Sequence, residues 1–80
     1  MATKNNSNSP PKYVLEEAGN MYLDLILYQG QDSKIVQRFS RRWFLEYPQT
    51  VASLQKMMAQ YTNGKNVFIA KEISYLFDKR

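Results

Sequence analysis

The chain has 80 residues, of which 44% are hydrophobic, and this length provides for one small domain but not for two. It contains no cysteine and no histidine, which excludes disulfides, thiolate zinc sites and cysteine nucleophiles and removes the commonest general base. Its net charge of +4 is too small to indicate by itself whether an acidic protein or a nucleic acid is the partner.

The first twelve residues are polar, with Asn, Ser, Thr and Lys and a Pro-Pro pair. A segment of this composition buries too little apolar surface to offset the entropy lost on ordering. We therefore predict a disordered arm at 1–12 and a single small globular domain at 13–80. The chain shows neither the apolar stretch of a secretory signal nor the roughly 20 apolar residues that cross a bilayer. We expect a cytoplasmic protein without membrane contact.

Residues 14–28 are compatible with two structures. On a helix, their acidic side chains gather on one side and most of their apolar side chains on the other, as in an amphipathic helix. The alternation of Leu23, Leu25 and Leu27 instead favours a strand, in which case Gly19 belongs to a turn before it. The residues alone leave both structures open.

Residues 33–47 are predicted to form an amphipathic helix. Either Asp32 or Ser33 can cap its first turn, apolar residues then recur at helical spacing, and Pro48 interrupts the pattern. Four cations fall together on the side opposite the apolar one. These cations are Lys34, Arg38, Arg41 and Arg42.

Residues 51–61 give the clearest helical pattern of the chain. Apolar residues follow one another at spacings of three, four and three, from Val51 through Leu54 and Met58 to Tyr61. Asn63 and Gly64 come next, and this pair is typical of a helix end because both residues tolerate a left-handed backbone. We predict a helix that ends before them.

A last helix is predicted from Asn66, which can serve as its cap. Lys79 and Arg80 come near its end, where the helix dipole favours cations. The residues expected on its buried side are Ile69, Ala70, Ile73, Leu76 and Phe77.

Four short helices joined by short loops predict an all-α fold, a compact bundle. The alternative is an α+β fold. In that alternative, residues 21–28 and 34–40 form a β-hairpin with a turn at 29–33, the helix of residues 51–61 follows, and a third strand begins at Val67.

The four cations are the first candidate binding site. On a helix, Lys34, Arg38, Arg41 and Arg42 would share one face, where they could engage carboxylates or neutralise phosphates. The same residues would also form an ordinary solvated helix face, which most surface helices have.

Aromatic side chains are the second candidate. The chain has eleven of them, more than a domain of this size is expected to bury. Phe44, Phe68 and Tyr75 lie away from the predicted apolar stripes, and exposed aromatic side chains are frequent in interfaces. They could equally complete a small core from several sides.

These patterns favour binding over catalysis. We predict a non-enzymatic regulatory or adaptor protein, without cofactor or metal, whose basic helix face and exposed aromatic side chains bind an acidic surface of a partner protein. One alternative is a DNA- or RNA-binding module in which the same cations contact phosphates. Another is a homo-oligomeric structural subunit, such as a homodimer, whose exposed aromatic side chains are buried by a second copy.

Overall fold

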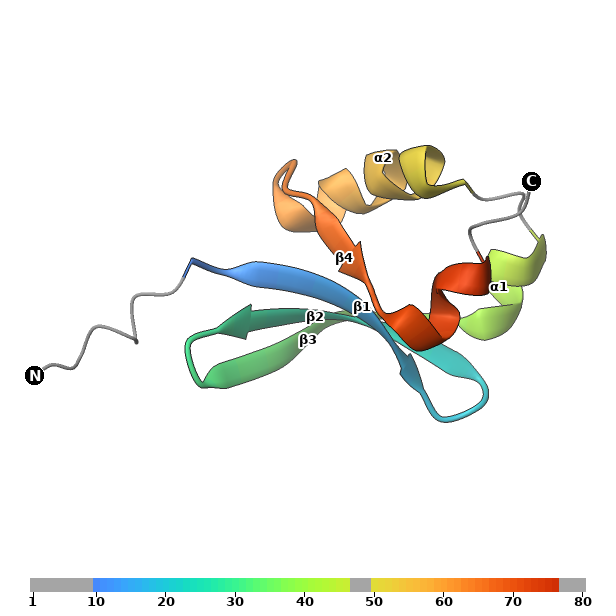
Figure 1. The fold of residues 1–80 in the computed structure, drawn as a ribbon, viewed down its shortest axis with the longest axis horizontal. Helices are drawn as coiled ribbons and strands as arrows, with labels where there is room; N and C mark the ends of the chain where they lie inside the picture. The colour runs from blue at the N-terminus through green and yellow to red at the C-terminus, as the bar shows by residue number, and fades with distance from the viewer. Residues whose placement is uncertain (1–9, 47–49, 77–80) are drawn as a thin grey trace, which may run out of the picture.

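The computed structural model describes residues 10–46 and 50–76. Within these ranges the chain forms four strands, two α-helices and one 3-10 helix (Figure 1). In chain order they are β1 (Lys12–Ala18), β2 (Tyr22–Gln29), β3 (Asp32–Ser40), α1 (Arg41–Glu46), α2 (Val51–Thr62), β4 (Val67–Ile69) and the 3-10 helix η2 (Lys71–Leu76).

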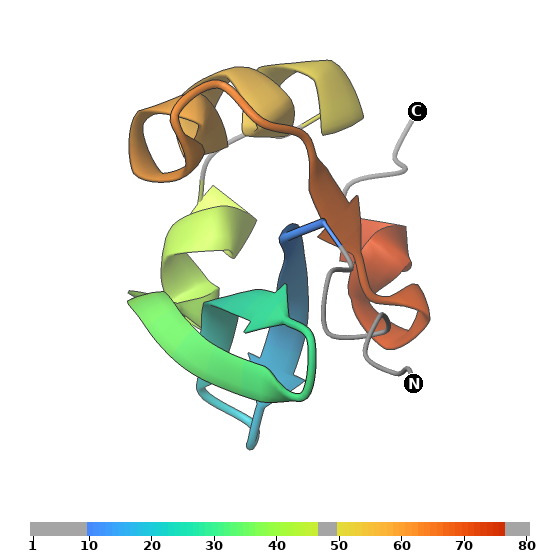
Figure 2. The ribbon, with the colours of Figure 1, turned by 90° about the vertical axis from the view of Figure 1, so that its left-hand side faces the viewer.

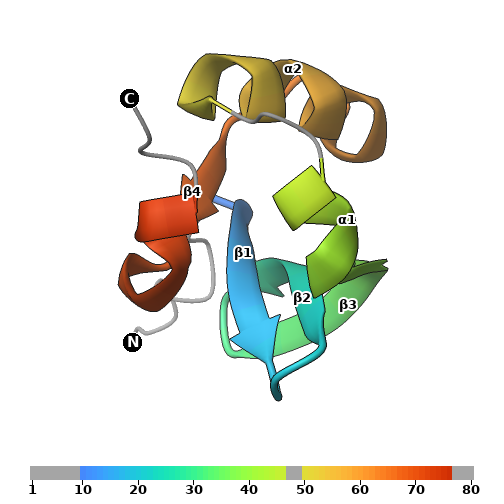
Figure 3. The ribbon, with the colours of Figure 1, turned by 90° about the vertical axis from the view of Figure 1, so that its right-hand side faces the viewer.

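The strands form a mixed sheet in the order β3-β2-β1-β4. β1 pairs with β2 and β2 with β3 in antiparallel ladders, whereas β4 runs parallel to β1. The chain passes from β3 at one edge to β4 at the other through α1 and α2. This crossover brings β4 back in the direction that lets it run parallel to β1. Figures 2 and 3 show α1 close to the hairpin of β2 and β3, and α2 next to β4.

The predicted all-α bundle is wrong, because residues 12–40 form three strands. Gly19 and Gly30, with φ of 68° and 63°, lie in the two tight turns between them. This left-handed backbone is easily adopted by glycine and is what short hairpin turns require. The α+β alternative had placed a hairpin at 21–28 and 34–40, which corresponds to β2 and β3, but it lacked β1.

The predicted helix of residues 51–61 is confirmed as α2. Thr50 and Ser53 form a capping box at its start. The hydroxyl of Thr50 accepts a hydrogen bond from the Ser53 amide at 3.1 Å, and the hydroxyl of Ser53 accepts one from the Thr50 amide at 3.0 Å. At its end Asn63 takes a left-handed backbone with φ of 56°, as the predicted stop requires.

The predicted helix from Asn66 is only partly present. Residues 67–69 are extended as β4, and the helical part is the 3-10 helix η2. Ile73 and Leu76 are buried as expected, and Ile69 and Ala70 are partly buried against the same core. Phe77, Lys79 and Arg80 lie outside the described residues. The strand forms because Val67 to Ile69 pair with the start of β1, which favours extended over helical backbone.

The core lies on one side of the sheet. Leu15, Leu23 and Leu25 point into it from the two central strands and are fully buried. The other buried apolar residues, one on β4 and the rest on the three helical segments, belong to the same cluster and are Phe44, Leu54, Met58, Val67, Ile73 and Leu76. All three helical segments therefore pack against the same face of the sheet.

Candidate interaction surface

The other face of the sheet is covered by none of the described helices. Side chains alternate along a strand, and residues paired across a ladder share a face, so the register identifies which side chains lie there. We call this side the open face. Its side chains are Lys12, Val14, Glu16, Ala18, Tyr22, Asp24, Ile26, Tyr28, Ser33, Ile35, Arg38, Ser40 and Phe68.

Four apolar side chains cross the open face at right angles to the strands. Phe68 on β4 pairs with Val14 on β1, Val14 with Ile26 on β2, and Ile26 with Ile35 on β3. Phe68 is 57% and Ile35 53% exposed, whereas Val14 and Ile26 are partly buried. We call these four residues the apolar row. A solvated sheet face is normally polar, so an apolar row through all four strands is a candidate contact surface.

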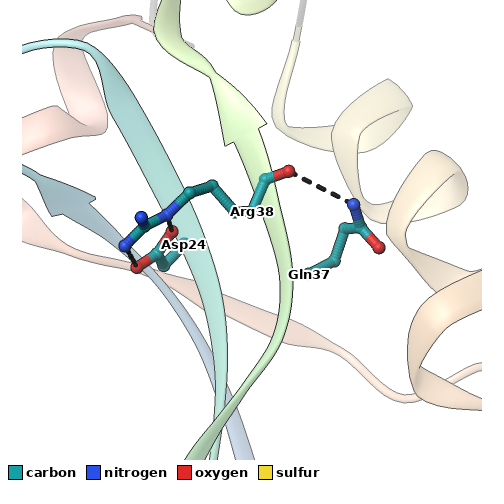
Figure 4. Close-up of polar contacts among 3 residues, drawn as sticks. All are labelled: Asp24, Gln37 and Arg38. Atoms are coloured by element: carbon teal, nitrogen blue, oxygen red, sulfur yellow. Dashed lines mark hydrogen bonds and ion pairs between the residues drawn. The ribbon is translucent and has the colours of Figure 1, made fainter.

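A charged row lies next to the apolar row, formed by Glu16, Asp24 and Arg38 on neighbouring strands. The guanidinium of Arg38 donates two hydrogen bonds to the carboxylate of Asp24, at 2.7 and 2.8 Å. Figure 4 shows the Arg38 side chain reaching to Asp24 while Gln37 extends from the opposite side of β3. Because the Asp24 side chain is only 6% exposed, this bidentate pair neutralises a nearly buried carboxylate.

The environment of Arg38 is favourable to its charge. Its hydrogen bonds to Asp24 and the negative charge of that carboxylate raise the pKa of Arg38 above its ordinary value. Its guanidinium carbon also lies 5.1 Å from the ring centre of Tyr22, within the range of a cation–π interaction. Arg38 is therefore held on the open face by interactions within the chain, although its side chain is half exposed.

Tyr28 reaches across the apolar row. Its hydroxyl donates a hydrogen bond to the carboxylate of Glu16, and the paired residues Val14 and Ile26 lie between the two in the ladder. This hydrogen bond, together with burial and the charge of Glu16, raises the pKa of Tyr28 above its ordinary value. The carboxylate of Glu16 is thereby fixed at one side of the row.

Lys12 lies at the other side of the row, at the start of β1. Its Nζ is 5.0 Å from the ring centre of Phe68, which is a second cation–π contact on the open face. β1 therefore places a cation and a carboxylate on the two sides of Val14, with the register of the strand separating them.

The four cations predicted to share a helix face do not share one. Lys34 and Arg38 lie on β3, four residues apart, a spacing that places two side chains on the same face of a regular strand. The register between β2 and β3 shifts at Leu25 and Ile26, which leaves Val36 as the extra residue of a β-bulge. As a result Lys34 lies on the core side of the sheet and Arg38 on the open face.

Arg41 and Arg42 begin α1 and have different surroundings. Arg41 donates hydrogen bonds to the Glu17 carboxylate at 2.7 Å and to the Tyr75 hydroxyl at 2.6 Å, which connects α1 to β1 and η2. Its side chain is only 20% exposed. The side chain of Arg42 is 84% exposed and pairs with Glu46 one turn later at 3.6 Å, in a solvated contact that adds little stability.

Of the three aromatic residues predicted as contacts, Phe44 is buried. It is 1% exposed and packs against Phe39 and Trp43, with ring centroids 5.5 and 4.8 Å apart. The prediction of an exposed Phe44 was wrong because it assumed one helix from residue 33, whereas α1 begins at Arg41 and turns this ring into the core. The predicted exposure of Phe68 and Tyr75 is confirmed at 57% and 55%.

Phe68 and Tyr75 belong to different surfaces. Phe68 is part of the apolar row, whereas Tyr75 lies on η2, where its hydroxyl accepts the hydrogen bond from Arg41. The structure thus does not bring the predicted site residues together. The sequence prediction missed the other members of the row, Val14, Ile26 and Ile35. The signal for Ile26 was the apolar content of both alternating sets of residues in β2.

A shallow pocket of about 240 Å³ lies at the end of the β2–β3 hairpin. Its lining residues are Leu27, Gln29, Asp32, Ser33 and Lys34. It brings the predicted contact residue Lys34 near the carboxylate of Asp32, which offsets the positive charge of the lysine. We therefore place the candidate site on the open face rather than in this pocket.

No protein-family model matches the chain, and neither a curated protein sequence nor a solved structure matches it significantly. Its function must therefore be inferred from the open face. In the described ranges no helix has the length and apolar character to span a membrane. The same residues contain no cluster of three side chains that could hold a metal ion.

Proposed function

We propose that the chain is a non-catalytic protein-binding module whose open face is covered by another polypeptide. The proposal rests on the apolar row, which spans all four strands and includes two side chains that are more than half exposed. The sequence of β2, YLDLILYQ, is apolar or aromatic on both of its alternating faces apart from Asp24 and the terminal Gln29. Such nearly continuous apolar runs are typical of strands that are buried on both faces.

The charges of the open face favour a protein over a nucleic acid. Lys12 and Arg38 are balanced there by Glu16 and Asp24, so the face has no excess of positive charge to attract phosphates. The middle of the apolar row is aliphatic and offers no rings on which successive bases could stack. Apolar contact with a protein surface is the interaction that remains.

The originally predicted acidic partner loses its geometric support. Lys34 lies on the core side of the sheet, and Arg38 and Arg41 are engaged with carboxylates of the chain itself. Binding through the open face would depend on burial of apolar surface, with charges setting orientation. A cytoplasmic location and the absence of catalysis stay predictions from the composition.

The proposal can be tested with one substitution and a matched control. Ile35→Glu places a charge in the apolar row, whereas Val51→Glu makes the same change at an aliphatic residue of α2 that is 49% exposed. Tagged wild type and both variants are used as baits in lysate of the source cells, with and without nuclease. The retained proteins, including untagged copies of the chain, are quantified by mass spectrometry.

We expect wild type and Val51→Glu to retain the same proteins in equal amounts. Ile35→Glu should retain at least tenfold less of each, and nuclease should not change these amounts. Equal retention by all three baits would contradict the proposal. Loss of the retained material after nuclease treatment would show that the ligand is a nucleic acid instead.

A further inference from the structure

We infer that the polypeptide that covers the open face is a second copy of this chain, packed sheet against sheet about a two-fold axis that runs along the apolar row. The inference rests on the proposed function, since it names the partner of the same face. It follows from the order of side chains on that face and from the state of the two sheet edges.

The open face has three successive rows that matter for self-association. The apolar row lies in the middle. On one side of it the register places Lys12, Tyr28 and Ser33, and on the other side Glu16, Asp24 and Arg38. On β1 these rows place a cation on one side of Val14 and a carboxylate on the other.

A two-fold axis along the apolar row lays each strand against the same strand of the second copy, running in the opposite direction. The apolar row then meets itself. Because the two flanking rows exchange sides, Lys12 of each copy lies opposite Glu16 of the other. Closed two-fold interfaces require self-complementarity of this kind, and here it gives two symmetric charge pairs around an apolar centre.

The other two-fold axis in the plane of the face, parallel to the strands, gives an unfavourable arrangement. It lays β1 against β2 of the second copy and brings Glu16 opposite Asp24. Like charges facing each other across an interface disfavour it. Charge complementarity thus selects the axis along the row, in which the two sheets pack with nearly aligned strands.

The sheet edges do not offer an equally good contact. At the β4 edge, the Gln55 side chain of α2 donates to the Val67 carbonyl at 2.5 Å and accepts from the Val67 amide at 2.7 Å. At the β3 edge, the bulge at Val36 interrupts the regular backbone spacing that a pairing strand needs. The face, not an edge, is therefore the surface that suits a second copy.

The size of the open face limits the expected affinity of the dimer. Strands lie about 4.8 Å apart, so four of them span roughly 15–20 Å, and the interface falls near the lower limit for specific complexes. We therefore expect a reversible dimer with a dissociation constant of ~10–100 µM rather than a permanent one.

Charge exchange tests the inference directly. Lys12→Glu leaves only acidic groups beside Val14, and Glu16→Lys leaves only basic ones, so each variant repels its own copy but complements the other variant. Lys56→Glu changes the net charge as Lys12→Glu does, at an exposed residue of α2, and serves as the control. Sedimentation equilibrium measures the association of each protein and of the equimolar mixture from about 1 µM to 1 mM.

We expect wild type and Lys56→Glu to dimerise equally, each single exchange to weaken dimerisation at least tenfold, and the mixture to recover it within about threefold. If Glu16→Lys does not fold, Ile35→Glu and Val51→Glu replace the pair, and only Ile35→Glu is expected to be monomeric.

Wild type that remains monomeric at 1 mM would overturn the inference, even if its open face retains another protein in the capture experiment. A dimer that neither exchange affects would overturn it too, because the contact would then lie elsewhere. The capture experiment with Ile35→Glu tests the proposed function separately.

Discussion

The two faces of the sheet are built from the same strands but differ in what covers them. Leu25 points into the core and is fully buried, whereas its neighbour Ile26 points to the open face, where the next residue of the apolar row, Ile35, is 53% exposed. One apolar face is sufficient to fold a small domain against its helices. The second apolar face is therefore better explained by binding than by folding of the single chain.

The largest expected difference concerns two phenylalanines that the sequence did not distinguish. Phe44→Ala empties a fully packed site and should cost about 3–5 kcal/mol of unfolding free energy, close to the whole stability of a small domain. Phe68→Ala on the open face should cost less than about 1 kcal/mol. Urea unfolding below the concentration at which dimers form measures both. Equal losses would mean that the two faces do not differ as described.

A second comparison uses neighbouring residues of β2. Leu25→Ala should cost about 2–5 kcal/mol because it leaves a cavity in the core. Ile26→Ala should cost clearly less in the dilute monomer, since Ile26 lies on the open face and outside the core cluster, but should weaken dimerisation. The two properties are measured by urea unfolding and by sedimentation. An Ile26→Ala variant that loses as much monomer stability as Leu25→Ala would contradict the account of the open face.

A third comparison concerns ion pairs. Arg38→Met leaves the nearly buried carboxylate of Asp24 without its bidentate partner and should lower the urea midpoint measurably. Arg42→Met removes a solvated pair with Glu46 and should leave the midpoint unchanged within error. The reverse order would show that Asp24 does not depend on Arg38.

A fourth comparison concerns the Tyr28 hydroxyl. Tyr28→Phe removes its hydrogen bond to Glu16 and should cost about 1 kcal/mol at neutral pH. Because the pKa of Tyr28 is raised in the folded chain, this stabilisation is complete below about pH 10 and is lost as the pH rises through the folded pKa. The stability difference between wild type and Tyr28→Phe should therefore shrink above pH 10. A difference that stays constant to pH 11 would contradict the assigned hydrogen bond.

Local signals were sufficient to predict α2, and non-local ones were needed for the rest. The spacing of Leu54 and Met58 and the stop at Asn63 are encoded within a few residues of the helix itself. The strands were obscured because apolar side chains on both faces of β2 imitate a helical pattern. The positions of the cations depended on the bulge at Val36, a feature of pairing between strands that no local pattern reveals.

The absence of cysteine allows the most direct test of the central claim, that a second copy covers the open face. A single thiol is introduced by Ile35→Cys in one protein and by Val51→Cys in another, and each is alkylated at low concentration while unlabelled wild type is added up to 1 mM. The claim predicts that alkylation at position 35 slows at least fivefold as wild type is added, while alkylation at position 51 does not change. Alkylation at position 35 that is independent of wild-type concentration would contradict it.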